Sequence, residues 1–145
     1  MSRNYLFVYG TLLTSSEHPM GTLLRQHARL SARGSIQARL YQIDDPDAPG
    51  KNTYPGALPS PNPDDRVHGE VYAVMDPDTL YPAFDDFEAC GPAWPEPHEF
   101  LLREVTVSLA DGLSRKAMCY LYTWDVSSAQ LIPSGRFTDV APNVI

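Results

Sequence analysis

Three acidic residues that could carry chemistry lie close together in the sequence FDDFEACG, residues 84–91. The segment has helical spacing, and its expected core-facing stripe consists of Leu80, Phe84 and Phe87. At about 100° per residue, Glu88 falls only about 40° from Phe84, at the edge of that stripe. Asp85 and Asp86 are expected to point well away from it, toward solvent. The three carboxylates are therefore predicted to have different environments.

A carboxylate at the edge of an apolar face loses contact with water, which raises its pKa and makes it a stronger base once it is ionised. Proton abstraction needs such a group, so Glu88 is a candidate general base. Periodicity alone leaves a second interpretation open, in which Glu88 ends the helix and keeps its carboxylate in water.

The second candidate is the sequence YGTL, residues 9–12, which follows a short apolar run. Gly10 would let the backbone amides of Thr11 and Leu12 point into a concavity and bind a small carboxylate. A glycine that simply ends a strand is the alternative. Four residues do not decide between the two interpretations.

Histidine and cysteine offer no clear metal site. The spacing of the four histidines fits neither an HExxH helix nor a zinc set built on CxxC pairs. The two cysteines, Cys90 and Cys119, are too few for a disulfide framework, and we expect plain thiols. We therefore assign no metal-binding residue.

These side chains must be positioned by a fold with more strands than helices. Strands are expected at residues 4–9, 35–43, 67–75, 99–109 and 115–124, and helices at 20–31 and from Asp76 onward. The first strand is apolar at both alternating sets of positions, so it is expected to be covered on both faces. Asp76 has the place of a helix cap, and Pro82 is expected to interrupt the helix and start a second one.

Residues 44–66 form the least regular stretch, which is dense in proline and aspartate. We expect a long surface excursion in which residues 54–58 touch the body of the protein. Such excursions are often functional or mobile.

Composition narrows the classes of function. The chain has 145 residues, 43% of them hydrophobic, with 11 basic and 18 acidic residues and a formal charge of −7. A nucleic-acid partner is disfavoured, because binding phosphates needs a basic face. No stretch approaches the roughly 20 apolar residues that span a bilayer, and the first residues do not fit a signal peptide. The expected location is the cytoplasm, with no membrane partner.

The mixed order of strands and helices predicts an α+β fold with a strongly curved sheet or a small barrel. The length suits one domain, residues 1–145, with one core.

Seven short motifs occur in an order that is specific as a set. They are VYGTL at residues 8–12, YPGAL at 54–58, VHGEVYAV at 67–74, FDDFEA at 84–89, REVTV at 103–107, AMCYLY at 117–122 and IPSGRF at 132–137. In these motifs the sequence resembles the gamma-glutamylcyclotransferase-like family, also called the AIG2-like group, over nearly the whole chain.

The resemblance implies a small mixed-strand barrel flanked by short helices, with a cavity at one end. It implies that Glu88 acts as the general base and that the YGTL loop holds the substrate through its backbone amides. The substrate-binding residues expected on this basis are Tyr9, Gly10, Thr11, Leu12, Tyr54 and Tyr120. No metal or organic cofactor is implied.

The activity that the resemblance implies is the cyclisation of a gamma-glutamyl amine or amino acid to 5-oxoproline, with release of the amine. The expected partner is thus a small gamma-glutamyl molecule. Two other functions stay open: a small-molecule binding protein that uses the same cavity without turnover, and an interaction protein that uses the proline-rich stretch 44–66.

Overall fold

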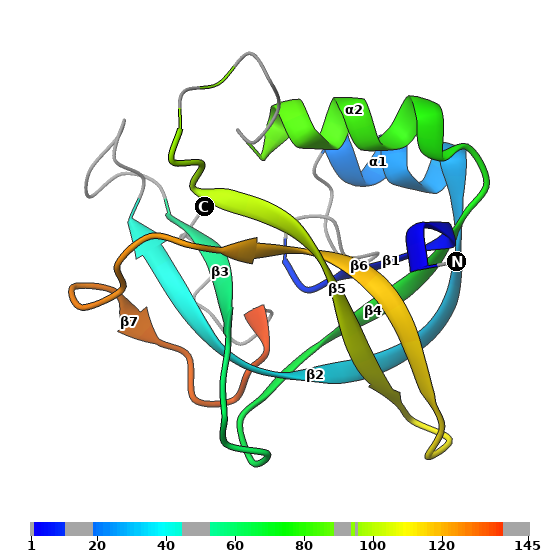
Figure 1. Ribbon diagram of the computed structural model, residues 1–145. Helices are drawn as coiled ribbons and strands as arrows, with labels where there is room; N and C mark the ends of the chain where they lie inside the picture. The colour runs from blue at the N-terminus through cyan, green and yellow to red at the C-terminus, as the bar shows by residue number, and fades with distance from the viewer. Residues whose placement is uncertain (1, 11–18, 45–52, 89–93, 95, 138–145) are drawn as a thin grey trace.

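The computed structural model of the protein describes residues 2–10, 19–44, 53–88, 94 and 96–137 (Figure 1). The elements are η1 (Ser2–Asn4), β1 (Tyr5–Val8), α1 (Pro19–His27), β2 (Ala28–Asp44), β3 (Thr53–Pro59), β4 (Arg66–Val74), α2 (Pro77–Phe87), β5 (Phe100–Leu109), β6 (Ser114–Tyr122) and β7 (Gln130–Leu131). None of the helices in these described ranges is long and apolar enough to cross a membrane.

Within the described chain, five strands close a barrel in the order β2-β4-β1-β6-β5, and β5 returns to pair with β2. The β1–β6 pair is parallel and the other pairs of the barrel are antiparallel, so the barrel is mixed. β3 and β7 add to the second half of β2. The predicted α+β fold, a small mixed-strand barrel flanked by short helices, is confirmed.

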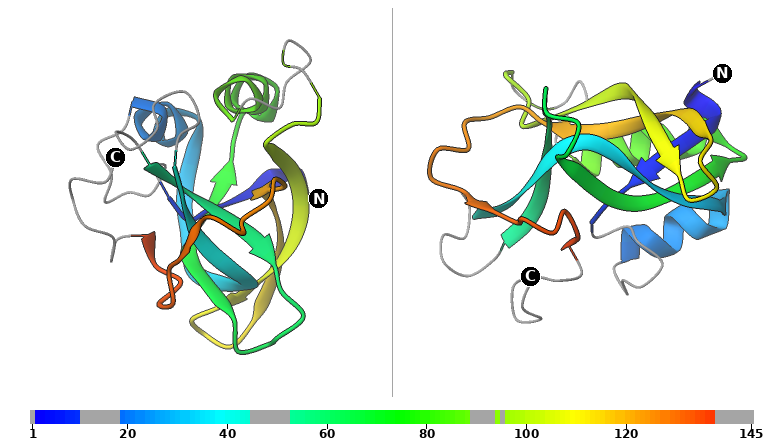
Figure 2. Two further views of the ribbon diagram at one scale, coloured as in Figure 1. Left: turned by 90° about the vertical axis from the view of Figure 1, so that its left-hand side faces the viewer. Right: turned by 90° about the horizontal axis from the view of Figure 1, so that it is seen from below.

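Both helices lie on one side of the barrel (Figure 2). Side chains of β1 show why its two alternating sets are apolar. Phe7 points into the barrel with a cluster that includes Val71 and Cys119, whereas Leu6 and Val8 point outward, toward the helices. The prediction that this strand is covered on both faces is confirmed, because three of its four residues are buried.

The predicted surface excursion at residues 44–66 is wrong for its second half, because Thr53–Pro59 forms β3 and pairs with β2 along its whole length. Pro55 and Pro59 hide this strand from sequence patterns. They are tolerated because β3, among the described strands, pairs with β2 alone and so lies at a sheet edge, where a missing N–H costs little. The prediction that residues 54–58 touch the body is confirmed, since Ala57 is fully buried.

The helix after Asp76 begins as predicted, because the Asp76 side chain accepts a hydrogen bond from the Thr79 N–H at 3.3 Å. Pro82 does not interrupt it, which corrects the sequence prediction, since α2 continues to Phe87. Burial of Leu80 and Phe84 on its inner face offsets the hydrogen bond that the proline cannot make. The predicted core-facing stripe of this helix is wrong in one residue, because Phe87 is 40% exposed and Tyr81 is buried instead.

Two other boundaries differ from the predictions. α1 ends at His27 rather than at residue 31, and β2 starts directly after it, seven residues earlier than expected. Leu23, Leu24 and Leu30 have near-helical spacing, but Leu30 already pairs with Tyr72 in the sheet. Gly69 of β4 lies close to β1, since a Cβ there would lie 2.1 Å from the carbonyl oxygen of Val8.

Candidate active site

Glu88 follows the last residue of α2, and its N–H donates to the carbonyl of Phe84 at 2.8 Å. This places Glu88 one helical turn after the fully buried Phe84 and on the same side of the helix. The residue as a whole is partly exposed, but its carboxyl group is desolvated. Burial, and after it the negative charge of Glu99, raises the pKa of Glu88 to about 8. The carboxyl group of Glu88 therefore has the desolvated environment that helical spacing predicts.

Among the residues that the structure describes, three titratable groups interact electrostatically with Glu88. Besides Glu99, they are the hydroxyl of Tyr9 and the thiol of Cys119, whose pKa values are raised by their burial and further by the charge of Glu88. Tyr9 follows β1, Cys119 lies in the middle of β6, and Glu99 precedes β5. Distant parts of the chain thus meet around one carboxylate at one end of the barrel.

Tyr9 holds this end of the barrel together through its side chain. Its hydroxyl donates to the carbonyl of Tyr120 at 2.7 Å and accepts from the N–H of Ala57 at 3.2 Å. The ring is buried, with 7% exposed. Because β1, β3 and β6 are joined at this hydroxyl, the backbone that leads into the YGTL sequence leaves the barrel from a rigid anchor.

Gly10 is held by β3. A Cβ at this position would lie 2.3 Å from Cγ of Pro55, closer than any side chain allows, so the glycine permits the contact between YGTL and YPGAL. Gly10 thus has a packing role at the end of the strand, and the binding of a carboxylate by the amides beside it stays a prediction. Thr11 and Leu12 lie outside the described residues.

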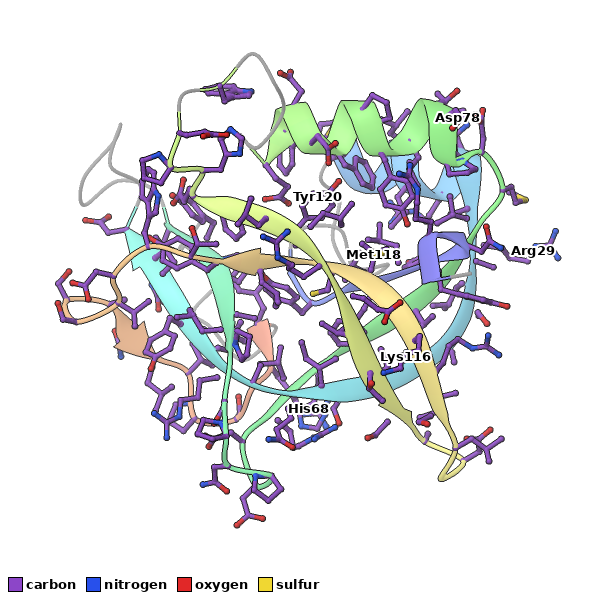
Figure 3. All side chains as sticks on the ribbon, viewed as in Figure 1. Arg29, His68, Asp78, Lys116, Met118 and Tyr120 are labelled. Atoms are coloured by element: carbon purple, nitrogen blue, oxygen red, sulfur yellow. The ribbon has the colours of Figure 1, made fainter. Side chains whose placement is uncertain are left out.

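Tyr120 lies on the side of the barrel that faces α2 (Figure 3). Its hydroxyl donates to Oδ1 of Asp85 at 2.7 Å. The expectation that Asp85 points well away into solvent is wrong, because α2 packs closely enough on β6 for this hydrogen bond. Asp86 is exposed, as predicted, and accepts from the indole of Trp94 at 3.0 Å.

Glu99 is the residue that the sequence analysis missed. The hydroxyl of Tyr54 donates to its carboxylate, and the ring of Tyr54 lies 6.1 Å from that of Phe100. The Glu99 main chain is fixed as well, since its carbonyl accepts from the N–H of Thr123 at 2.9 Å. An acidic residue at the start of a strand, in the sequence HEFLL, was the available signal, but nothing local showed that it faces Glu88.

The predicted site residues that the structure describes are therefore linked. Glu88 interacts with Tyr9 and, through Glu99, with Tyr54, while Tyr9 bonds to Tyr120. The arrangement offers a desolvated carboxylate beside a second carboxylate, with tyrosine hydroxyls around them. Such a site suits proton transfer.

A cavity of about 270 Å³ opens between the β2–β3 edge and residues 125–130. Tyr122 lines it, and burial together with the charges of Glu99 and Asp125 raises the pKa of Tyr122 to about 12. Glu88 does not line this cavity. No cluster of three or more His, Cys, Asp or Glu side chains suited to a metal ion occurs among the described residues.

The sequence matches a family described as gamma-glutamyl cyclotransferase, AIG2-like, over residues 6–139. No match is found among curated proteins.

Solved structures share the fold. An AIG2-like protein from Mus musculus is 22% identical with a TM-score of 0.71, and the match covers 96% of this chain and 90% of that one. An uncharacterised protein from Pyrococcus horikoshii is 20% identical with a TM-score of 0.60, over 93% and 90% of the two chains. A gamma-glutamyl cyclotransferase is 18% identical with a TM-score of 0.61, over 88% and 68%.

Proposed function

The chain belongs to the gamma-glutamyl cyclotransferase, AIG2-like family, and on that premise we propose that it cyclises a gamma-glutamyl amine or amino acid to 5-oxoproline. The observation that carries the proposal is the desolvated carboxyl group of Glu88, which we take as the general base. Strongly shifted pKa values cluster at groups that transfer protons in catalysis. We therefore favour an enzyme over a non-catalytic binding protein that uses the same cavity.

In the proposed reaction, Glu88 accepts one proton from the substrate and later donates one proton to the leaving group. The ionised carboxylate accepts a proton from the alpha-ammonium group of the substrate, which frees the amine. The amine nitrogen then attacks the gamma-carbonyl of the same molecule and forms the new C–N bond of 5-oxoproline. The old amide C–N bond breaks as the leaving nitrogen takes up two protons, one from the attacking nitrogen and one from Glu88, so that the amine leaves as an ammonium ion and Glu88 is ionised again.

The rest of the site would bend the substrate into this attack geometry. Orientation is effective here because the reaction is intramolecular, and holding two groups in place can supply several kcal/mol. We propose that the backbone amides of residues 9–12 hold the carboxylate of the substrate, with Tyr54 and Tyr120 as side-chain contacts. The rigid anchor of Tyr9 and the contact between Gly10 and Pro55 support this assignment.

We further propose that residues 1–145 act as one catalytic domain in the cytoplasm. The family match over residues 6–139 and the closed barrel support the single domain.

The first test is turnover. The purified protein is incubated with a panel of gamma-glutamyl amino acids and amines, and 5-oxoproline is measured by mass spectrometry. We expect product from the wild type and a loss of about 10²- to 10⁴-fold in Glu88→Gln, the range of general-base contributions.

Asp86→Asn is the matched control, because this neighbouring carboxylate on the same helix is exposed and should leave turnover unchanged. Full turnover by Glu88→Gln would exclude Glu88 as the base. No product from the wild type with any member of the panel would favour the binding protein instead.

A further inference from the structure

A row of polar side chains crosses three strands on the outer face of the barrel, away from the candidate active site. Ser35 on β2 is paired with His68 on β4 and with Ser108 on β5. Paired residues in a sheet point to the same face, and Arg66 lies two residues from His68 on that face. The residues between them point inward, since Ile36, Val67 and Val107 are buried in the barrel.

The guanidinium of Arg66 is held in place by this row. Its Nε donates to Oγ of Ser35 at 3.1 Å, and one terminal nitrogen donates to the carbonyl of Ser35 at 2.9 Å and to Oγ of Ser108 at 3.0 Å. The other terminal nitrogen donates to no acceptor among the described residues. A fixed guanidinium with an unused edge is preorganised for a further acceptor.

A turn at residues 134–136 brings a second arginine to the same place. The carbonyl of Gly135 accepts from the N–H of His68 at 2.8 Å. Gly135 has a φ of +68°, and a Cβ there would lie 1.8 Å from the carbonyl oxygen of Arg66, so only glycine allows the turn to pack on β4. The charge of Arg136 therefore acts on His68, whose pKa is lowered by burial and then by Arg136 and Arg66.

No carboxylate neutralises this group of cations in the described part of the chain. Asp65, next to Arg66 in sequence, bonds instead to Arg39 at 2.7 Å and to Ser60 at 2.6 Å. Glu70, two residues beyond His68 on the same strand face, pairs with Arg33 at 3.6 Å. The chain as a whole carries a charge of −7, so an uncompensated positive group runs against its overall balance.

We propose that these residues, Arg66, His68 and Arg136 with Ser35 and Ser108, form a binding site for a small tetrahedral oxyanion of the phosphate type. The oxyanion would accept from the unused edge of Arg66 and from Arg136, a geometry that guanidinium groups favour. The negative charge of the bound anion favours the protonated form of His68, and the protonated ring then supplies a third donor. Figure 3 shows His68 low on the barrel, far from α2 and from Tyr120, so this site is separate from the candidate active site.

The test is a histidine NMR titration of the whole protein. The ring resonance of His68 is followed at pH 6 while inorganic phosphate is added, with sodium chloride at equal ionic strength as the reference. We expect a saturable shift at His68 with phosphate alone, and an upward shift of its pKa at saturating phosphate. A parallel titration with glycerol phosphate distinguishes two sources of the anion. Tighter binding of inorganic phosphate indicates free phosphate as the ligand, and tighter binding of glycerol phosphate indicates a phosphomonoester.

Arg136→Gln should weaken phosphate binding about tenfold, in line with the loss of one charge-assisted hydrogen bond. Its side chain makes no hydrogen bond within the described residues, so the variant should fold normally. Arg103→Gln is the matched control, an exposed arginine whose guanidinium bonds, in the described part of the chain, only to the carbonyl of Leu102, and the affinity of this variant should equal that of the wild type. No saturable shift at His68, the same shift with chloride, or equal loss in both variants would overturn the proposal.

Discussion

At the scale of single residues, the chemistry of the candidate active site depends on two carboxyl groups. Burial keeps Glu88 protonated up to a pH near its pKa of about 8, and Glu99 adds to this because two negative charges repel. A base must be ionised to accept a proton, so the proposed turnover should rise with pH and level off above about pH 8. The hydroxyl of Tyr54 holds Glu99 in the position from which it acts.

Glu99→Gln should lower the pKa of Glu88 without returning it to 4.5, because burial is the larger of the two causes. The pKa is measured by carbon NMR of the glutamate side chains, and the ascending limb of the pH–rate profile should move to lower pH with it. Glutamine keeps an acceptor for Tyr54, so the packing is preserved. Glu104→Gln, at an exposed position on β5, is the control and should change neither measurement. An unaltered pKa of Glu88 in Glu99→Gln would show that the two carboxyl groups do not interact.

At the scale of elements, α2 determines where Glu88 points. The Asp76 cap sets the start of the helix, and the burial of Leu80 and Phe84 sets its rotation. Pro82 is a local conflict within this helix, because it cannot donate to the carbonyl of Asp78. The helix forms regardless, since its packing outweighs the local cost.

Replacing Pro82 with alanine should therefore stabilise the protein. The restored hydrogen bond is worth more than the extra entropy of the unfolded chain, and we expect the free energy of unfolding to rise by about 2 kcal/mol. Urea denaturation measures the change. Pro77→Ala is the comparison, because a proline in the first turn loses no hydrogen bond and its replacement should bring no gain. Equal effects of the two substitutions would contradict the view that Pro82 is strained.

At the scale of the whole molecule, closure of the barrel divides the protein into an inner core and an outer face. The outer face is covered by the two helices at one end and carries the proposed oxyanion site at the other (Figures 1 and 3). β2 is shared by the barrel and by the strands added to it, since it pairs with β4 and β5 and also with β3 and β7. The barrel closes where Gly34 meets β5. A Cβ at Gly34 would lie 2.4 Å from the carbonyl oxygen of Ser108, so this close approach needs glycine.

Gly34→Ala should open this closing contact. A methyl group forced against backbone costs about 1–3 kcal/mol, and hydrogen exchange should speed up in β5 and in the adjoining part of β2. Gly21→Ala is the control, because its Cβ would meet only the flexible end of Arg25, at 3.2 Å, and alanine favours the helix. Full stability of Gly34→Ala would mean that β5 does not need this close approach.

Local patterns in the sequence determined much of this protein. A short apolar run predicted β1, alternation predicted most of β4, the Asp76 cap predicted the start of α2, and helical spacing predicted the desolvated position of Glu88. Each of these depends on residues a few positions apart, whose relative directions follow from backbone geometry alone. The ordered motifs supplied the fold class, because they extend over nearly the whole chain.

Only the tertiary structure decided which distant residues meet. Glu99 near Glu88, Asp85 on Tyr120, Gly10 against Pro55 and Arg136 beside His68 are separated by about ten to seventy positions in the sequence. Their contacts depend on strand register, on barrel curvature and on the packing of α2, which no local period encodes. The same packing overrode the local signal of Pro82, because burial of neighbouring apolar side chains outweighs the loss of one hydrogen bond. Pro55 is tolerated for another reason, the place of β3 at the edge of the sheet.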